Sequence, residues 1–297
     1  MSNIQIAKVC GLCAGCNRAV NTVVNEIKNG ERVTIFKEIV HNKNVNKYLE
    51  NIGAKCENEI ENLTNDTVII IRAHGEPPET YKIFEERGIK YRDCTCVNVE
   101  KIHKAVAEYS EKGYRIIIIG KHKNTMHPEV FGTIGWAGNN VILIESEEDF
   151  YQIQSIENEK FYLVCQTTFN LTKAEELIDK IEKIAKSNNC EIIINKSICE
   201  AQKIINEYSV RLAKESDVMI VVGGLNSSNS YELYKNVNSI CPSIFIEDIN
   251  SYKSALNEKG IIIDKDTKIG LTAGASTRKE ELIELKEIII KDLDKTN

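Results

Sequence analysis

Short runs of β-branched and aliphatic residues alternate along the chain with longer stretches in which apolar residues recur at helical spacing. The short runs predict strands, because uninterrupted apolar residues suit strands that are buried on both faces. They cover residues 4–9, 33–39, 68–71, 115–119, 141–144, 161–164, 192–195, 218–222, 243–246 and 268–271. The longer stretches have one apolar face and predict helices. They cover residues 18–28, 78–87, 99–112, 171–187, 201–215, 231–237 and 278–292.

This alternation predicts an α/β protein with mostly parallel sheets covered by helices on both faces. A chain of 297 residues is long enough for more than one domain, and its 4 prolines mark no linker. We therefore place the domain boundaries where one strand–helix series gives way to the next. The predicted domains are residues 1–96, 97–196 and 197–297.

Charge and composition exclude several classes of function. A formal net charge of −6 leaves no basic face for nucleic acid or an anionic membrane. The first residues show no signal peptide, and the longest apolar runs are far too short to span a bilayer. We therefore expect a cytoplasmic protein, in which 10 cysteines are better explained by metal binding, catalysis or burial than by disulfides.

The turns that follow the predicted strands carry most of the reactive side chains. Ligands of open parallel sheets bind beyond the carboxyl ends of the strands, so these turns are the expected binding region. Small, hydroxylated, His or Cys residues occupy nearly all of them. The turns are residues 10–16, 40–42, 72–75, 127–129, 165–168, 223–230 and 272–276.

Two of these turns, residues 226–229 and 274–276, are suited to an anion. Each leads into a helix, where backbone N–H groups are available and Ser and Asn side chains add further donors. Helix capping alone would also explain either turn. Three histidines at other strand ends, His41, His74 and His127, favour phosphate, and the absence of a Walker pattern argues against nucleotide hydrolysis.

Glu129 follows His127 at the end of another predicted strand. A carboxyl group there could donate a proton if its surroundings raise its pKa. An ordinary glutamate in the first turn of a helix is the alternative interpretation.

The cysteines fall into two groups. Those without a nearby cysteine are interpreted as small buried hydrophobic residues: Cys56, Cys165, Cys190 and Cys241. The others form close sets on loops or open a helix: Cys10, Cys13, Cys16, Cys94, Cys96 and Cys199. Thiolates at helix starts are stabilised as metal ligands, and the spacing is compatible with an iron–sulfur cluster or with zinc.

Taken in order, these motifs resemble the family of 4-hydroxy-3-methylbut-2-enyl diphosphate reductase, the terminal enzyme of the non-mevalonate isoprenoid pathway. The resemblance spans nearly the whole chain. It is carried by Gly11-Leu12-Cys13-Ala14-Gly15, Val40-His41-Asn42, Ala73-His74-Gly75, Thr95-Cys96, His127-Pro128-Glu129, Gln166-Thr167-Thr168, Ile198-Cys199, residues 226–230 and residues 272–276.

The resemblance implies three small α/β domains arranged as a trefoil around a central [4Fe–4S] cluster. Cys13, Cys96 and Cys199 would hold the cluster and leave one iron without a protein ligand. The implied reaction is a two-electron reductive dehydroxylation that yields isopentenyl and dimethylallyl diphosphate.

The resemblance also assigns roles to the turns. Glu129, Thr167 and His127 would be catalytic. The residues implied to bind the diphosphate are His41, His74, His127, Ser227, Ser228, Asn229 and Ser276. No dinucleotide fingerprint is present, so an external ferredoxin or flavodoxin would supply the electrons.

Departures from the family pattern lie beside the implied cluster ligands. Cys10, Cys16 and Cys94 are additional thiols, and the residues after Cys199 differ from the usual ones. Two alternatives therefore stay open: a reductase of another small hydroxylated or phosphorylated substrate, and a non-enzymatic iron–sulfur sensor or electron carrier in which an extra thiol closes the cluster. Glu129 argues against a carrier, which needs no proton donor.

Overall fold

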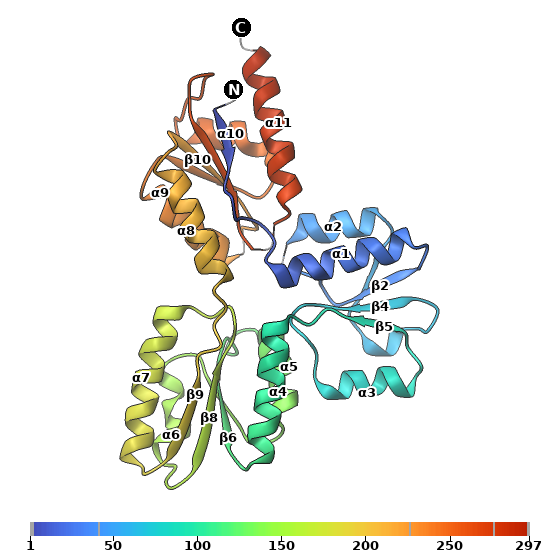
Figure 1. The fold of residues 1–297 in the computed structure, drawn as a ribbon, viewed down its shortest axis with the longest axis vertical. Coiled ribbons are helices and arrows are strands. Elements are labelled where there is room, and N and C mark those ends of the chain that lie inside the picture. Colours follow the sequence, from blue (N-terminus) through green and yellow to red (C-terminus); the bar gives the residue numbers. More distant parts are fainter. Residues whose placement is uncertain (1–2, 41, 226, 276, 296–297) are drawn as a thin grey trace. The chain divides into compact units, whose positions relative to one another are not determined.

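The computed structural model describes residues 3–40, 42–225, 227–275 and 277–295 (Figure 1). Its strands are β1 (Ile4–Ile6), β2 (Val33–Phe36), β3 (Lys55–Glu57), β4 (Val68–Ile71), β5 (Tyr91–Asp93), β6 (Arg115–Ile119), β7 (Val141–Ile144), β8 (Lys160–Cys165), β9 (Glu191–Asn195), β10 (Val218–Val222), β11 (Ser243–Ile246) and β12 (Ile269–Ala273). Its α-helices are α1 (Ala14–Lys28), α2 (Lys43–Asn51), α3 (Pro78–Glu86), α4 (Val97–Glu111), α5 (Pro128–Ala137), α6 (Tyr151–Gln154), α7 (Leu171–Ser187), α8 (Ala201–Ala213), α9 (Ser228–Asn238), α10 (Tyr252–Glu258) and α11 (Lys279–Lys295).

The strands form three four-stranded sheets, in the orders β1-β12-β10-β11, β3-β2-β4-β5 and β7-β6-β8-β9. The pairs β1–β12, β12–β10, β10–β11, β2–β4, β4–β5, β7–β6, β6–β8 and β8–β9 are all parallel. The prediction of an α/β protein with parallel sheets is therefore confirmed.

The chain divides into two compact units. The first consists of Met1–Gly30, Glu38–Cys56 and Glu200–Asn297. Its sheet packs α10 and α11 on one face and α8 and α9 on the other, as Figure 1 shows, and a separate hydrophobic core fills each interface. The apolar strands are thus buried on both faces, which explains their uninterrupted hydrophobic runs.

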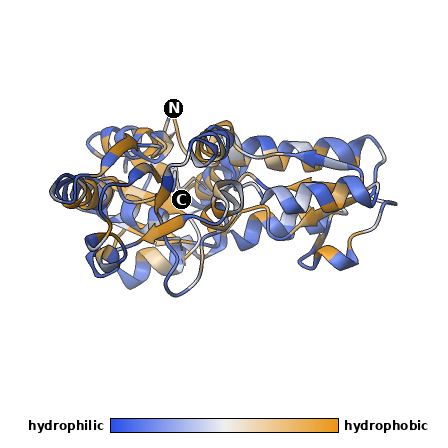
Figure 2. Cartoon of the chain, turned by 90° about the horizontal axis from the view of Figure 1, so that it is seen from below, coloured by the Kyte–Doolittle hydropathy of each residue, from blue (hydrophilic) through white to orange (hydrophobic). Residues whose placement is uncertain are grey.

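The second unit consists of Glu31–Lys37 and Glu57–Cys199. In it, the sheet β7-β6-β8-β9 lies between α6 and α7 on one face and α4 and α5 on the other, with a core on each side. The strands β2, β4 and β5 pack against α3 through Phe36, Ile69 and Phe84. Figure 2 shows the same division between hydrophobic strands and helices that carry hydrophilic faces.

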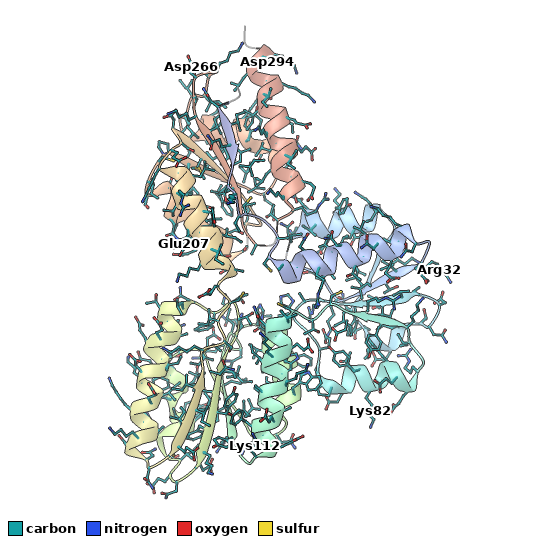
Figure 3. The ribbon with its side chains drawn as sticks, in the orientation of Figure 1. Arg32, Lys82, Lys112, Glu207, Asp266 and Asp294 are labelled. Carbon is teal, nitrogen blue, oxygen red and sulfur yellow. The ribbon has the colours of Figure 1, made fainter. Side chains whose placement is uncertain are left out.

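Charged side chains lie on the outer helix faces. Lys82 on α3 and Lys112 at the end of α4 point away from their helices in Figure 3, with side chains 75% and 54% exposed. Their ion pairs with residues four positions earlier or later are worth only a few tenths of a kcal/mol each, roughly 0.3–0.5. Within the described ranges of the chain, no helix is long and apolar enough to cross a membrane.

Every predicted strand is present, and each predicted helix corresponds to one of the helices. The prediction missed β3, β5 and the helices α2, α5, α6 and α10. In α5 the interior glycines Gly132 and Gly135 weaken the helical signal. Gly135 nevertheless has a packing reason, because a Cβ atom there would lie 2.4 Å from Cβ of Pro77.

The division into residues 1–96, 97–196 and 197–297 stays a prediction. One pairing in the first unit was not foreseen: β1 lies beside β12, with Ile4 opposite Ile269. The two ends of the chain therefore share one sheet.

Candidate active site

Glu129 and Thr167 form a buried pair in the second unit. Glu129 lies in the first turn of α5 and is 1% exposed, and Thr167 lies in the turn after β8. The Glu129 carboxylate accepts from the backbone N–H of Thr167 at 2.5 Å and from its hydroxyl at 2.7 Å. Both oxygens of the carboxylate are thus held by one residue of a neighbouring turn.

Burial raises the pKa of Glu129 to about 7, and the two hydrogen bonds from Thr167 only partly oppose this effect. Removing a carboxylate from water disfavours its charged form, while donors aimed at it favour that form. Glu129 can therefore hold or release a proton near neutral pH, as a general acid must.

His127 and His74 meet beside this pair. The Nδ1 atom of His127 accepts from the backbone N–H of Glu129 at 3.3 Å and caps α5. An Nδ1 atom that accepts places the ring proton of a neutral imidazole on Nε2, so His127 presents a donor there. His74, in the turn after β4, packs edge-on against His127, with ring centroids 5.2 Å apart.

Cys96 and Cys199 belong to the same group of contacts. The N–H of Cys96 donates to the carbonyl of Ala73, next to His74, at 2.9 Å, and the N–H of Cys199 donates to the carbonyl of Thr167 at 2.7 Å. The Nδ2 group of Asn98, two residues after Cys96, lies 3.5 Å from Sγ of Cys199. The second unit thus brings together six residues predicted from the sequence: His74, Cys96, His127, Glu129, Thr167 and Cys199.

A buried ion-pair group that was not predicted from the sequence supports the turn that carries His74. Glu76, with no exposed surface, binds Lys37 at 2.7 Å and Arg72 at 3.2 Å. Its backbone carbonyl accepts from the indole N–H of Trp136 at 3.0 Å. The charged triplet and Trp136 therefore connect β2, the turn after β4 and α5. In the sequence, the only local sign of this triplet is a glutamate that stands between His74-Gly75 and two prolines.

His103 was also not assigned a role. Its ring is 3% exposed and stacks on Trp136, with centroids 5.5 Å apart. Burial lowers its pKa to about 4, so the imidazole is neutral at physiological pH. It lies against Gly75, where a Cβ atom would be 2.7 Å from its Cε1 atom.

The first unit holds the turn of Cys13. Cys13 precedes α1, and its N–H donates to the carbonyl of Ala275 at 3.2 Å, while the N–H of Leu12 donates to the carbonyl of Thr277 at 2.7 Å. Hydrogen bonds from the Cys16 thiol and from nearby backbone N–H groups lower the pKa of Cys13 to about 6 against the opposing effect of burial. A thiolate at this helix start is therefore favoured, as a soft metal ligand requires.

The start of α9 adjoins the same turn. Ser227 caps α9 by accepting from the N–H of Ser230 at 3.3 Å, and a Cβ atom at Gly274 would lie within 2.0 Å of the Ser230 hydroxyl. Asn229 follows in the first turn of α9. The turns after β1, β10 and β12 therefore meet at one end of this sheet, as expected for a binding region at the carboxyl ends of parallel strands.

Three of the predicted diphosphate ligands are only partly accounted for. His41 and Ser276 lie outside the described residues. Ser228 begins α9, but its side chain lies outside what the structure describes. The roles of all seven predicted diphosphate ligands remain predictions.

The proposed cluster ligands suit an iron–sulfur cluster by donor chemistry. Cys13 and Cys96 stand at the N-caps of α1 and α4, and Cys199 directly precedes the N-cap of α8. Helix N-termini stabilise thiolates. Cys13 belongs to the first unit and the other two to the second, and over the ranges 3–40, 42–225, 227–275 and 277–295 no group of three or more His, Cys, Asp or Glu side chains is arranged to hold a metal ion.

Two of the additional cysteines, Cys10 and Cys94, make contacts within the fold. The Sγ atom of Cys10 donates to the carbonyl of Ala7 at 3.2 Å, and burial raises its pKa. Cys94 is 2% exposed, and its backbone N–H continues the pairing of β5 with the end of β4.

Comparison with known proteins gives one consistent result. The LytB protein family matches residues 4–289. The chain is 38% identical over 285 residues to the 4-hydroxy-3-methylbut-2-enyl diphosphate reductase of Clostridioides difficile, covering 93% of this chain and 94% of that protein. It is 35% identical over 278 residues to the enzyme of the same name from Alkaliphilus oremlandii, covering 93% and 95%.

Two solved reductase structures are also similar to this chain over most of its length. The structure of (E)-4-hydroxy-3-methyl-but-2-enyl diphosphate reductase, the terminal enzyme of the non-mevalonate pathway, matches with a TM-score of 0.78 and 30% identity over 98% of this chain and 100% of that one. The E-1-hydroxy-2-methyl-but-2-enyl-4-diphosphate reductase of Plasmodium falciparum matches with a TM-score of 0.77 and 27% identity over 97% and 87%. The chain thus shares the α/β fold of these reductases, and it belongs to the LytB protein family.

Proposed function

We propose that this protein is an iron–sulfur reductase that converts 4-hydroxy-3-methylbut-2-enyl diphosphate to isopentenyl and dimethylallyl diphosphate. Two electrons and two protons remove the allylic hydroxyl group as water and place one hydrogen on carbon. The proposal includes a cytoplasmic location and an external ferredoxin or flavodoxin as the electron donor. The observation that carries it is the buried Glu129–Thr167 pair, in a chain whose relatives bear the name of this reductase.

Glu129 is the proposed proton donor. Its pKa of about 7 keeps a substantial fraction of the carboxyl group protonated at neutral pH, and Thr167 fixes both oxygens. The buried setting excludes water that would otherwise compete for the proton. His127, held through Nδ1, would carry its ring proton on Nε2 and is the proposed second donor.

Cys13, Cys96 and Cys199 are the proposed cluster ligands, because each stands at a helix start that favours the thiolate. A bound cluster with one iron lacking a protein ligand would supply electrons and a Lewis acid for the hydroxyl oxygen.

The diphosphate would be bound by neutral donors. Backbone N–H groups at the start of α9 and the positive end of its dipole suit an anion. The proposed side-chain ligands are His41, His74, His127, Ser227, Ser228, Asn229 and Ser276. Because none of them is a fixed cation, binding should depend only weakly on ionic strength.

The decisive experiment is anaerobic turnover of reconstituted protein with 4-hydroxy-3-methylbut-2-enyl diphosphate and a strong one-electron donor. Mössbauer spectra with and without substrate would accompany it. We expect both C5 diphosphates as products and one iron site that responds to substrate.

Cys199→Ser tests the ligand set. This variant should lose or degrade the cluster, whereas Cys190→Ser should keep it, since the Cys190 thiol donates to the backbone carbonyl of Ile156 at 3.4 Å. Unchanged iron content in Cys199→Ser would remove Cys199 from the proposal.

Two alternative functions have distinct signatures in the same experiment. A responsive iron without turnover would indicate a reductase of another small hydroxylated or phosphorylated substrate. A full cluster without any responsive iron would indicate a sensor or electron carrier. The buried Glu129–Thr167 pair favours the enzyme, because a carrier has no use for a proton donor.

A further inference from the structure

The loop between β6 and α5 ends in His127 and is anchored at both of its ends. At its start, the N–H of Gly120 donates to the carbonyl of Ile144, the last residue of β7, at 3.0 Å. At its end, the N–H of His127 donates to the carbonyl of Lys121 at 3.0 Å, so the loop folds back on itself. Residues 124–126 between these anchors are exposed. The position of His127 therefore depends on how firmly the start of the loop is held.

One carboxylate oxygen holds the start of this loop. Glu145 directly follows β7, and its Oε2 atom accepts from the backbone N–H groups of His122 at 2.8 Å and Lys123 at 2.9 Å. Hydrogen bonds to an ionised acceptor are about twice as strong as those between neutral groups. The side chain of Glu145 is 24% exposed, so water competes only partly for the two N–H groups.

Glu145 is itself fixed by the turn that follows it. Asp149 accepts from the N–H of Glu145 at 2.7 Å and from that of Ser146 at 2.9 Å. Asp149 is 5% exposed and also pairs with Lys123 of the loop at 3.2 Å. The carboxylate of Glu145 is therefore carried by a backbone that is held on its own account.

A single peptide group connects Glu145 to His127. The carbonyl of Lys121 and the N–H of His122 belong to the same planar group, so neither can turn without the other. Glu145 holds the N–H of this group, and its carbonyl receives the N–H of His127. A carboxylate that accepts from one side of a peptide group also polarises the carbonyl on the other side and makes it a stronger acceptor.

We propose that Glu145 is a positioning residue for His127. Its carboxylate fixes the peptide group between Lys121 and His122, and that group fixes the backbone of His127 at the N-cap of α5. The ring of His127 then keeps the orientation in which Nδ1 accepts from the N–H of Glu129. The effect on the backbone is independent of the proposed function, whereas the effect on an anion rests on it, because it takes His127 as a ligand of the diphosphate.

Hydrogen exchange of the reconstituted protein tests the effect on the backbone. Mass spectrometry with electron-transfer fragmentation distinguishes the N–H of His127 from those of His122 and Lys123. In Glu145→Ala the N–H of His127 should exchange at least about 10-fold faster, because the loss of a hydrogen bond to a charged group releases its acceptor. An unchanged rate at His127 would overturn the proposal.

Two conservative variants and a control accompany this measurement. Glu145→Gln keeps an oxygen at the same reach and should protect the N–H of His127 to within about threefold of the unchanged protein. Glu145→Asp keeps the charge but withdraws the oxygen by one methylene group, so it should behave as the alanine variant does, and it provides the test if that variant does not fold. Protection by aspartate but not by glutamine would overturn the proposal.

Glu148→Ala is the matched control. The side chain of Glu148 is 85% exposed and contacts the same loop through the side chain of Lys123, at 2.8 Å. Exposed ion pairs contribute little to stability, so exchange at His127 should stay within about twofold of the unchanged protein. Equal acceleration in Glu148→Ala and Glu145→Ala would show that the loop responds to any lost contact, and it would overturn the specific role of Glu145.

Binding of inorganic diphosphate to the reconstituted protein, measured by isothermal titration calorimetry, tests the effect on an anion. A hydrogen bond to a charged ligand is worth roughly 10- to 100-fold in affinity, so His127→Ala should weaken binding to that extent and Glu145→Ala by about 10-fold. If Glu145 acts through His127, the double variant should bind no more weakly than His127→Ala. Additive losses would overturn the positioning role.

The two experiments fail separately. Diphosphate binding that is unaffected by His127→Ala would contradict the role of His127 in the proposed function. The exchange rate at His127 would still decide whether Glu145 holds this residue in place.

Discussion

Glu129 is subject to two opposing influences, and their balance sets its chemistry. Burial favours the neutral carboxyl group, and the N–H and hydroxyl of Thr167 favour the carboxylate, with burial the stronger. Neither influence alone would place the pKa near neutrality.

Glu129→Gln is expected to lower turnover by about 10²- to 10⁴-fold, the usual contribution of a positioned acid or base. The amide keeps the shape of the side chain and removes the transferable proton. Anaerobic steady-state kinetics measures the effect. The control is Glu147→Gln, an exposed glutamate in the same unit, which should leave turnover within about twofold since surface substitutions rarely matter. A fully active Glu129→Gln protein would contradict the role of proton donor.

The pH dependence of turnover should follow the same group. Glu129 is protonated below its pKa of about 7, so turnover should fall as pH rises through that value. The raised pKa also means that the folded protein binds an extra proton between about pH 4.5 and 7. Stability contributed by this group is therefore present at the lower pH and lost as pH rises. Urea denaturation at several pH values should show a smaller decline of this kind in Glu129→Gln, and an identical decline in both proteins would exclude Glu129 as its source.

At the scale of elements, the turn between β4 and α3 depends on contacts from several directions. It carries His74, and it is held by the Lys37–Glu76–Arg72 ion pairs, by Trp136 on α5 and by His103 on α4. Lys37 adopts φ +65°, a conformation that non-glycine residues rarely take, and its ion pair with Glu76 offsets this strain.

Glu76→Gln should lower the free energy of unfolding by about 3–5 kcal/mol, because it leaves Arg72 and Lys37 without their buried counter-charge. Urea denaturation followed by circular dichroism measures the change. Glu85→Gln on exposed α3 surface is the matched control, and it should stay within about 0.5 kcal/mol. Equal stability of the two variants would mean that the triplet contributes nothing net.

Gly75→Ala and Gly88→Ala separate backbone strain from packing. Both glycines have positive φ, +71° and +61°, so alanine costs each of them about 1–2 kcal/mol. Only Gly75 would also place its Cβ atom 2.7 Å from His103, whereas Gly88 has nothing within 4 Å. Gly75→Ala should therefore be less stable than Gly88→Ala by about 1–3 kcal/mol in the same denaturation assay. Similar losses would show that His103 moves aside without cost.

The elements that could be predicted from the sequence are those whose own pattern of apolar residues reflects how they are buried. The strands β4, β6 and β10 are apolar throughout because both faces are covered, and that pattern is readable locally. Helix α5 was missed because its glycines serve contacts with another helix, and β5 is too short and polar to show a period.

In the candidate site, too, features that follow from a local pattern could be predicted, whereas contacts between distant residues could not. Positions at strand ends gave His127, Glu129 and Thr167 as candidates, since the turn residues of parallel sheets are ordered by topology. Cys96 became a candidate through its spacing from Cys94. The hydrogen bonds of Thr167 to Glu129 and the ion pair of Lys37 with Glu76 join residues 38 and 39 positions apart. No local pattern encodes such pairs, so only the structure could reveal them.

At the scale of the whole molecule, the first unit is assembled from three separated stretches of chain, and both ends contribute to its sheet. Ile4, 3% exposed, packs into the same core as α11. The stability of this unit therefore depends on residues that begin the sequence as much as on those near its end.

Ile4→Asp should lower the free energy of unfolding by about 3 kcal/mol or more, because it buries a carboxylate without a partner. Gln5→Asp is the neighbouring control, since Gln5 is exposed in the same strand, and it should cost less than about 1 kcal/mol. Chemical denaturation measures both. Equal effects would mean that β1 is not an integral strand of this sheet.

The pairing of β1 with β12 sets an order of events during synthesis. A ribosome adds about 5–20 residues per second, so the segment that contains Ile4 waits on the order of tens of seconds before its partner around Ile269 emerges. Throughout that interval Cys10, Cys13 and Cys16 are on a nascent chain whose loop lacks the carbonyls of Ala273 and Ala275 that later hold it. If Cys13 is a cluster ligand as proposed, its loop would take its final position for the cluster only after β12 and the residues that follow it have been made.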